Sequence, residues 1–412
     1  MQQYWNQNLQ LADELVKQCE TLKPTDIMVG VLCKDVETTI LNVLNVINEG
    51  LYRYFPDYKK SIVVCEGGST DQTMEAIDLF HPYKSVDYIV THDITNGGKG
   101  AGVMTVLECA HYADAKCVVL MDGDLLSVKP QWVHTIANPI KYGRADLTVP
   151  YYIRDKNDGV ITNNLVYPFT RALYGIDIRQ PIAGEFALSK NLYEVLRNHP
   201  KFPPDFGVDI FIVTVAAAEG MYVKEGLYSL KIHESTTRYL DPEKFLIPMF
   251  RKVTGSMFEL AGHYEEYWKN RPKLPPRRFY HESFSKRPIP VKIDVENLKQ
   301  SFITEFDTAK ELMKQYLPES IITELSTVVK NGSGIDSELW AEIVYNYAAA
   351  YKAAKDEPGR YLLLDSLKTL WIGRFVSYAM ETKDMDINEA EVVLQKQAEV
   401  FEDKLGYLCS NY

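Results

Sequence analysis

The chain has 412 residues, enough for two domains, and with 46% hydrophobic and 25% charged residues it has the composition of an ordinary globular protein. Its formal net charge of −11 argues against nucleic acid or an anionic membrane surface as the main partner. The N-terminus lacks the charged and apolar regions of a signal peptide, and no apolar run approaches the length of about 18 residues that spans a bilayer. We therefore expect a cytoplasmic protein without a transmembrane segment.

The cysteines are scattered along the chain, and their spacing fits neither a zinc site nor a disulfide framework. Several of them lie in apolar, strand-like runs. We therefore expect buried free thiols in a reducing compartment. The six residues are Cys19, Cys33, Cys65, Cys109, Cys117 and Cys409.

Strands and helices are predicted to alternate in the first part of the chain. An amphipathic helix over residues 5–22 ends before Pro24, and four buried strands come next at a spacing of about 30 residues, separated by single helices. This rhythm predicts right-handed βαβ units and a mostly parallel sheet. The predicted strands are 27–33, 61–65, 86–91 and 117–122; the predicted helices are 39–47, 69–80 with a capping box at 69–72, and one from the turn at 96–100 to about Tyr112.

The alternation ends after residue 124. The remaining predicted elements are a strand at 146–153, a helix at 162–174, a loop at 182–185, an apolar helix at 209–218, an extended stretch at 222–232, and four or five amphipathic helices over 292–412. Aromatic residues of this last region are predicted to be core and interface residues: Trp340, Tyr345, Tyr347, Tyr351 and Trp371. Prolines between 272 and 290 indicate a linker. The predicted domains are an N-terminal helix (1–24), an α/β domain (25–270), a linker (271–291) and an all-α domain (292–412).

The fourth strand ends in Asp122-Gly123-Asp124. Ligands of open parallel sheets bind beyond the carboxyl ends of the strands, and two carboxylates there suit a divalent cation that itself holds phosphates. A lone Asp-x-Asp is more often a solvated turn, so its surroundings decide the interpretation.

Two glycine-rich turns lie at the same predicted edge of the sheet. Gly97-Gly98-Lys99-Gly100 places a lysine at a helix start, although it lacks the spacing of a P-loop, and Glu66–Asp71 comes after the second strand. Each turn by itself is explained by local structure. A lysine and a pair of carboxylates after consecutive strands of the chain, converging on one crevice, however, predict a site for a nucleotide diphosphate.

These motifs together resemble a known family. Residues 29–35, 67–71, 97–100 and 122–124 resemble the nucleotide-sugar-binding half of a GT-A-fold (Rossmann-like) glycosyltransferase. Gln180–Glu185 and Phe206–Asp209 narrow the resemblance to the retaining mannosylglycerate synthases and the related glucosyl-3-phosphoglycerate synthases. The similarity covers about residues 26–265.

The resemblance implies a role for each matching donor-side residue. Asp124 and His233 would bind Mg²⁺ or Mn²⁺ on the donor diphosphate, and Asp122 would hold the sugar or ribose end beside that metal. The remaining donor-side residues are Lys99 on the donor, Ser69 on the base or ribose, Gly184 and Glu185 in the sugar pocket, and Asp209 beside the reacting sugar. A double displacement would need Asp209 or Glu185 as the nucleophile, whereas a front-face reaction needs none.

The acceptor and the base are less well defined. Arg154, Asp158 and Thr162 match the spacing that binds glycerate in mannosylglycerate synthases, although residues 154–158 also read as a plain polar loop. In glucosyl-3-phosphoglycerate synthases an arginine grips the acceptor phosphate, and here Val160 stands in its place; Arg171, Arg179 or Lys156 are alternative grips. The family's first-strand proline and the glutamate after it are Leu32 and Val36 here, with Glu37 as a neighbouring substitute.

We therefore predict a metal-dependent, retaining transferase that moves a hexose from GDP-mannose or UDP-glucose to D-glycerate, giving a compatible-solute type of glycoside. The alternatives are a glucosyl-3-phosphoglycerate synthase, a sugar-phosphate nucleotidyltransferase, and a non-catalytic scaffold that binds sugar nucleotides. The expected partners are the donor and a small carboxylate acceptor, with a possible homo-oligomer formed through the C-terminal helices and no nucleic acid.

Overall fold

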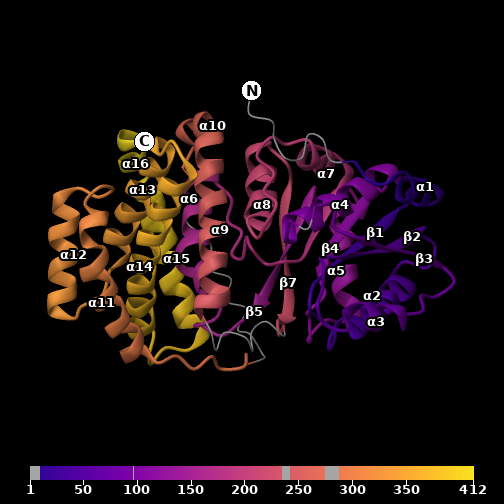
Figure 1. The fold of residues 1–412 in the computed structure, drawn as a ribbon, viewed down its shortest axis with the longest axis horizontal. Helices are drawn as coiled ribbons and strands as arrows, with labels where there is room; N and C mark the ends of the chain where they lie inside the picture. The colour runs from indigo at the N-terminus through magenta and orange to yellow at the C-terminus, as the bar shows by residue number, and fades with distance from the viewer. Residues whose placement is uncertain (1–9, 96, 234–241, 274–286) are drawn as a thin grey trace. The chain divides into compact units, whose positions relative to one another are not determined.

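The computed structural model describes residues 10–95, 97–233, 242–273 and 287–412. The chain divides into two compact units (Figure 1). The first unit comprises Met1–Tyr152 and Ile182–Leu246, and the second comprises Ile153–Pro181 and Ile247–Tyr412. The boundaries of these units differ from those of the domains predicted from the sequence. The predicted domain boundaries stay a prediction.

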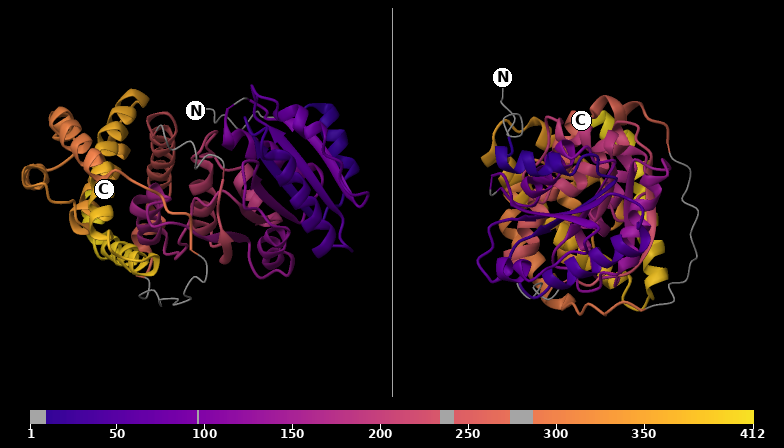
Figure 2. Two further views of the ribbon diagram at one scale, coloured as in Figure 1. Left: turned by 90° about the horizontal axis from the view of Figure 1, so that it is seen from below. Right: turned by 90° about the vertical axis from the view of Figure 1, so that its right-hand side faces the viewer.

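A seven-stranded sheet forms the centre of the first unit, in the order β3-β2-β1-β4-β6-β5-β7. The first four strands pair in parallel, whereas β6 runs antiparallel to both of its neighbours. The left view of Figure 2 shows the parallel strands side by side. The predicted α/β class with a mostly parallel sheet is thus confirmed. The strands are β1 (Ile27–Cys33), β2 (Lys60–Glu66), β3 (Val86–His92), β4 (Cys117–Asp122), β5 (Leu147–Ile153), β6 (Phe186–Ser189) and β7 (Val223–Leu230).

Helices cover both faces of this sheet (Figure 1). Helix α4 packs on β1, β2 and β4 and is buried from Gly100 to Ala110, which explains why its sequence is apolar on all sides. A Cβ added to Gly30 of β1 would lie 2.3 Å from Val106 of α4, so glycine is needed for this close approach. The helices of this unit are α1 (Asp13–Thr21), α2 (Ile40–Tyr54), α3 (Thr73–Asp78), α4 (Lys99–Tyr112), α5 (Pro130–Lys141), α7 (Lys190–Arg197) and α8 (Val208–Ala218).

Three local predictions differ from the structure. Helix α1 begins at Asp13, and residues 5–9 of the predicted helix lie outside the described residues. Helix α3 begins at Thr73, whose backbone N–H donates to Asp71 Oδ1 at 3.0 Å, so the predicted capping box at 69–72 is wrong. Strand β6 was not predicted, because it has only four residues and no alternating pattern.

The second unit is helical. Its residues 292–412 form six helices in the described part of the chain, where four or five were predicted. The short π-helical turn η2 (Thr162–Val166) precedes α6 (Tyr167–Tyr174), and α9 (Pro242–His263) belongs to this unit from Ile247 onward. The other helices are α10 (Glu265–Asn270), α11 (Val295–Met313), α12 (Glu319–Asn331), α13 (Ser337–Ala353), α14 (Glu357–Glu381), α15 (Ile387–Asp403) and α16 (Leu405–Asn411).

Aromatic side chains fill the core of the second unit. All five aromatic residues predicted for the core are buried. The Nε1–H of Trp340 donates to Asn164 O at 2.5 Å and that of Trp371 donates to Val160 O at 3.4 Å. A buried indole needs such an acceptor, so these contacts join the C-terminal helices to the segment 153–181.

The cysteines agree with the prediction of free thiols. All six are unpaired, five are buried, and Cys409 is partly exposed. Of the helices in the described part of the chain, none combines the length and the apolar character needed to cross a membrane.

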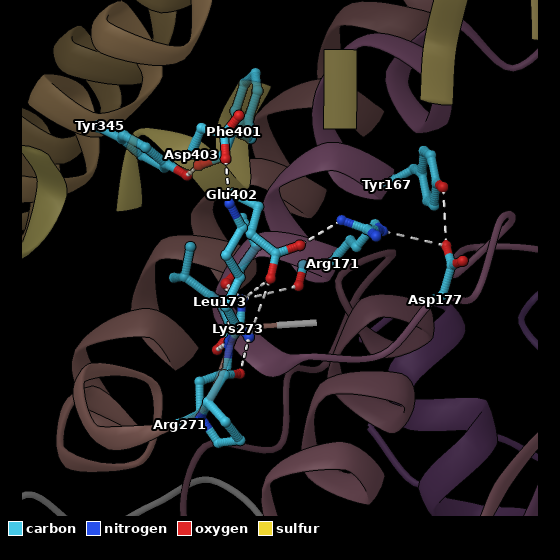
Figure 3. Close-up of polar contacts among 12 residues, drawn as sticks. Tyr167, Arg171, Leu173, Asp177, Arg271, Lys273, Tyr345, Phe401, Glu402 and Asp403 are labelled. Carbon is cyan, nitrogen blue, oxygen red and sulfur yellow. Dashed lines mark hydrogen bonds and ion pairs between the residues drawn. The ribbon is translucent and has the colours of Figure 1, made fainter. Parts of the chain in front are cut away.

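A buried ionic cluster lies within the second unit (Figure 3). The Glu402 carboxylate pairs with Arg171 and, at 3.3 Å, with Arg271 Nη2, and all three side chains are at most 4% exposed. Arg171 Nε also lies 3.5 Å from Asp177 Oδ1, whose carboxylate accepts a hydrogen bond from Tyr167 at 2.9 Å. Because buried charges are costly unless they are paired, this cluster ties α6 to α15 and to the end of α10.

We predict that Glu402→Gln lowers the free energy of unfolding by about 3–5 kcal/mol, since it removes the buried carboxylate that Arg171 and Arg271 share and leaves Arg171 with Asp177 at 3.5 Å. Chemical denaturation measures this change. The matched control is Asp403→Asn, which removes a 64% exposed carboxylate next to Lys273 and should leave stability nearly unchanged. Equal stability of the two variants would contradict the prediction.

Candidate active site

The carboxyl ends of the parallel strands β1, β2 and β4 lie side by side at one edge of the sheet. Leu32 at the end of β1 pairs with Asp122 of β4 on one side and with Cys65 of β2 on the other. The Gly123 N–H donates to Leu32 O at 2.8 Å, and a Cβ on Gly123 would lie 2.9 Å from Cys33 Cβ. Glycine between the two aspartates therefore lets the chain turn closely over β1.

Lys99 joins two carboxylates at this edge of the sheet. Its Nζ lies 3.0 Å from Asp122 Oδ1 and 3.1 Å from Asp209 Oδ1. Burial lowers the pKa of Lys99, but the two carboxylates outweigh burial and raise this pKa above its usual range. Burial raises the pKa of Asp209, partly offset by Lys99. The structure thus brings together three of the residues predicted for the donor site.

A second lysine holds the Glu185 carboxylate. Lys231 Nζ lies 2.8 Å from Glu185 Oε2, and the Tyr152 hydroxyl donates to the same oxygen at 2.7 Å. Glu185 is fully buried, and burial raises its pKa against the opposing effect of Lys231. Lys231 and Tyr152 were not predicted as site residues.

Gly184 connects the two groups of charges. Its φ is +95°, and a Cβ built on it would lie 2.5 Å from Asp122 Oδ2 and 3.1 Å from Lys231 Nζ. Only glycine fits a backbone of this conformation so close to a carboxylate. When all five groups are ionised, the carboxylates of Asp122, Asp209 and Glu185 and the ammonium groups of Lys99 and Lys231 leave one net negative charge around Gly184.

Asp124 and His233 lie next to each other, as the metal prediction requires. His233 Nδ1 is 3.6 Å from Asp124 Oδ2, and an antiparallel bridge between Leu125 and His233 holds the two segments together. Within the described residues there is no group of three or more His, Cys, Asp or Glu side chains arranged to hold a metal. A carboxylate and an imidazole still suit a cation whose other ligands are phosphate oxygens and water.

The glycine-rich turn before α4 serves packing. A Cβ on Gly100 would lie 2.0 Å from Pro203 O, and the Ala101 N–H donates to Pro204 O at 2.9 Å. The start of α4 is thus covered by the segment before α8. These glycines allow the two segments to approach, which places Lys99 beside Asp209.

The predicted base-side residues belong to two interlocked loops. Ser69 Oγ accepts from the Asp35 N–H at 2.9 Å, and Glu37 Oε2 accepts from the Gln72 N–H at 2.8 Å. Leu32 lies 3.3 Å from the Cβ position of Gly102 and is buried. Ser69 and Glu37 therefore have structural partners, and their contact with a base stays a prediction.

The predicted acceptor residues belong to the second unit. A Cβ on Gly159, whose φ is +68°, would lie 3.2 Å from Arg154 Nη1 and 3.8 Å from Thr162 Oγ1. The guanidinium and the hydroxyl therefore converge on one point. Asp158 lies in the same turn, where its carbonyl accepts from Asn163 Nδ2 at 2.9 Å. Thr162 also opens the π-helical turn η2, a feature that is frequent at functional sites.

A comparison with known families supports a glycosyltransferase of the GT-A type. Residues 29–192 match the family model described as Glycosyl transferase family 2. The predicted resemblance and class of enzyme are thus confirmed. No curated protein matches the chain.

The chain is also similar to solved structures of glucosyl-3-phosphoglycerate synthase from Mycobacterium tuberculosis. The complex with Mn²⁺, UDP and glucosyl-3-phosphoglycerate is 22% identical, with a TM-score of 0.45, and the match covers 61% of this chain and 86% of that chain. The complex with Mn²⁺, UDP-glucose and phosphoglyceric acid is 21% identical, with a TM-score of 0.46, and the match covers 69% of this chain and 94% of that chain. The complex with Mg²⁺ and UDP is 21% identical, with a TM-score of 0.45, and the match covers 67% of this chain and 92% of that chain.

We predict that Gly184→Ala lowers glycosyl transfer about 100-fold, because the added methyl group must displace the Asp122 carboxylate. The control is Gly220→Ala, since Gly220 also has a positive φ of +69° but no atom within 4 Å of its Cβ position. Both variants lose about 1–2 kcal/mol of stability from backbone strain. Steady-state kinetics and denaturation of both variants test this. If transfer fell equally in both, displacement of Asp122 would not be the cause.

Proposed function

We propose that this chain is a retaining, metal-dependent glycosyltransferase that moves a hexose from GDP-mannose or UDP-glucose to D-glycerate. The observation that carries the proposal is Lys99, 12% exposed at its side chain, between Asp122 and Asp209 in the segment that matches the glycosyl transferase family 2 model or directly after it. A preorganised cation at this edge stabilises the negative charge that develops on a leaving diphosphate.

The donor set supports a divalent cation. The cluster around Gly184 carries one net negative charge, and Asp124 beside His233 adds a further carboxylate. Asp124 and His233 would hold Mg²⁺ or Mn²⁺, with Asp122 nearby, and the cation would supply charge neutralisation for the diphosphate. Lys99 acts beside it as a fixed positive charge that orients the same group.

The acceptor proposal rests on the second unit. Arg154 and Thr162 converge at Gly159 and offer a guanidinium and a hydroxyl, which suit a small carboxylate. Val160, at the place where a phosphate-binding arginine would stand, is 7% exposed and offers no donor.

The alternative phosphate grips are already engaged by the protein. Arg171 pairs with Glu402 and Asp177, and Arg179 Nε makes a bidentate contact with Glu391 at 2.8 and 2.9 Å. Lys156 Nζ donates to three carbonyl groups near the end of α14: those of Thr382, Lys383 and Met385. These contacts favour an acceptor without a phosphate.

The test of the proposed function is product analysis by NMR over a panel of donors and acceptors with Mg²⁺ and Mn²⁺. We expect an α-linked hexosyl glycerate from an α-linked donor. Release of pyrophosphate from a nucleoside triphosphate would instead indicate a nucleotidyltransferase. Donor binding without turnover of any acceptor would indicate a scaffold.

We predict that Asp124→Ala abolishes transfer while the melting temperature stays close to wild type, because the proposal assigns this aspartate, 21% exposed at its side chain, to the metal. Titration of Mn²⁺ by electron paramagnetic resonance should show weakened binding in the presence of nucleoside diphosphate. The control is Asp87→Asn, which changes an exposed carboxylate of β3. Transfer by Asp124→Ala near the wild-type rate without added metal would refute the assignment of Asp124 to the metal.

We predict that D-glycerate has a higher kcat/KM than 3-phosphoglycerate. Arg154→Met should raise KM for glycerate about 10- to 100-fold, since a hydrogen bond to a charged group contributes about 1.5–3 kcal/mol, and should leave KM for the donor unchanged. The control is Arg53→Met, which removes a guanidinium that is 58% exposed on α2. A wild-type enzyme that prefers 3-phosphoglycerate would show that this acceptor assignment is wrong.

A further inference from the structure

Lys231 clamps both chain neighbours of Gly184. Its Nζ donates to Ala183 O at 2.7 Å and to Glu185 Oε1 and Oε2 at 2.9 and 2.8 Å. An ammonium group has three donors, and these contacts occupy all of them. Lys231 is 5% exposed at its side chain, so it serves the protein and not a bound substrate.

Glu185 is enclosed by the same contacts. It is fully buried, and its Oε2 accepts from the Tyr152 hydroxyl at 2.7 Å in addition to Lys231. Lys231 Nζ also lies over the Tyr152 ring, 5.2 Å from its centroid. Asp209, the other carboxylate considered as a nucleophile, keeps 13% of its side chain exposed and pairs with Lys99. The accessible carboxylate is therefore Asp209.

The Gly184 backbone lies between the Lys231–Glu185 ion pair and Asp122. The Cβ position of Gly184 lies 2.5 Å from Asp122 Oδ2, so the backbone that Lys231 holds on both sides also borders the Asp122 carboxylate. Movement of this backbone by a few tenths of an ångström would press on or release Asp122. In a dense interior such a displacement passes directly to the neighbouring group.

We propose that Tyr152, Glu185 and Lys231 form a brace that fixes the Gly184 backbone against Asp122, and that Glu185 is a positioning residue and not the nucleophile. The inference rests on the proposed glycosyl transfer, whose donor Asp122 would hold. It assigns Lys231 and Tyr152 a role in the reaction, exerted through Asp122.

The brace is tested by removing its charges one at a time and together. Glu185→Gln or Lys231→Met alone leaves a buried charge without its partner, and we expect kcat/KM to fall about 100-fold in each. The double variant Glu185→Gln/Lys231→Met leaves no such charge, and we expect it to recover at least tenfold over either single variant. A nucleophile cannot be restored in this way, so a double variant as inactive as Glu185→Gln overturns the proposal.

Two further comparisons make the experiment specific. Lys99→Met/Asp122→Asn removes an ion pair of the donor site itself, and we expect no recovery over its single variants. Tyr152→Phe removes one hydrogen bond and should fold normally. We expect its kcat/KM to fall about three- to tenfold. We expect no such fall when Tyr152→Phe is added to the Glu185→Gln/Lys231→Met variant. The control Tyr88→Phe changes a buried hydroxyl with no hydrogen-bond partner among the described residues. A loss from Tyr152→Phe that persists in the double-variant background also counts against the brace.

Binding and turnover by the wild type separate this proposal from the proposed function. Titration with UDP, GDP and their hexose conjugates, followed by transfer assays, is done first. A wild-type chain that neither binds nor turns over a donor refutes the proposed function. An active wild type with an unrecovered double variant refutes the brace alone. Rates are expressed per folded protein, measured from the unfolding curve of each variant.

Discussion

The first unit depends on the partial neutralisation of three carboxylates by two lysines at the strand ends. Asp122, Glu185 and Asp209 come from stretches far apart in the sequence, and isolated charges in such surroundings are strongly unfavourable. Lys99 fixes where α4, β4 and α8 meet, because its ammonium group needs both aspartates. The geometry of the candidate site is therefore largely a consequence of ion pairing, with glycines admitting the backbone to the places that this pairing requires.

Carboxylates are also paired with cationic side chains in the second unit, but there the charges balance. Its cluster contains the carboxylates of Glu402 and Asp177 and the guanidinium groups of Arg171 and Arg271, so the charges of the two signs are equal in number. In the first unit the carboxylates outnumber the lysines, and the excess lies at the edge where parallel sheets bind ligands. The excess of carboxylates in the first unit supports the proposed donor site, whereas the balanced cluster of the second unit serves as a structural contact.

Elements that a local pattern specifies are the ones that the sequence predicts most clearly. Strand β1 was predicted with its observed bounds, because a continuous apolar run between turn residues has few other solutions. Asp122 and Lys99 were predicted from their places after buried strands, whereas Asp209 was predicted only through the family resemblance. Tyr152 and Lys231 were not predicted, since a tyrosine in a strand and a lysine in an extended stretch carry no local signal of a shared carboxylate.

The acceptor side shows most directly why sequence reasoning stops short. Arg171, Arg179 and Lys156 are equally basic in the sequence, and each was open as a phosphate grip. Their carboxylate or carbonyl partners lie 231, 212 and 226–229 residues away along the chain. Whether a basic side chain remains available for an acceptor is thus decided by tertiary pairing. Arg154 lies with Thr162 around Gly159, where a Cβ would come within 3.2 Å of the Arg154 guanidinium, and this local arrangement supports its proposed place on the acceptor side.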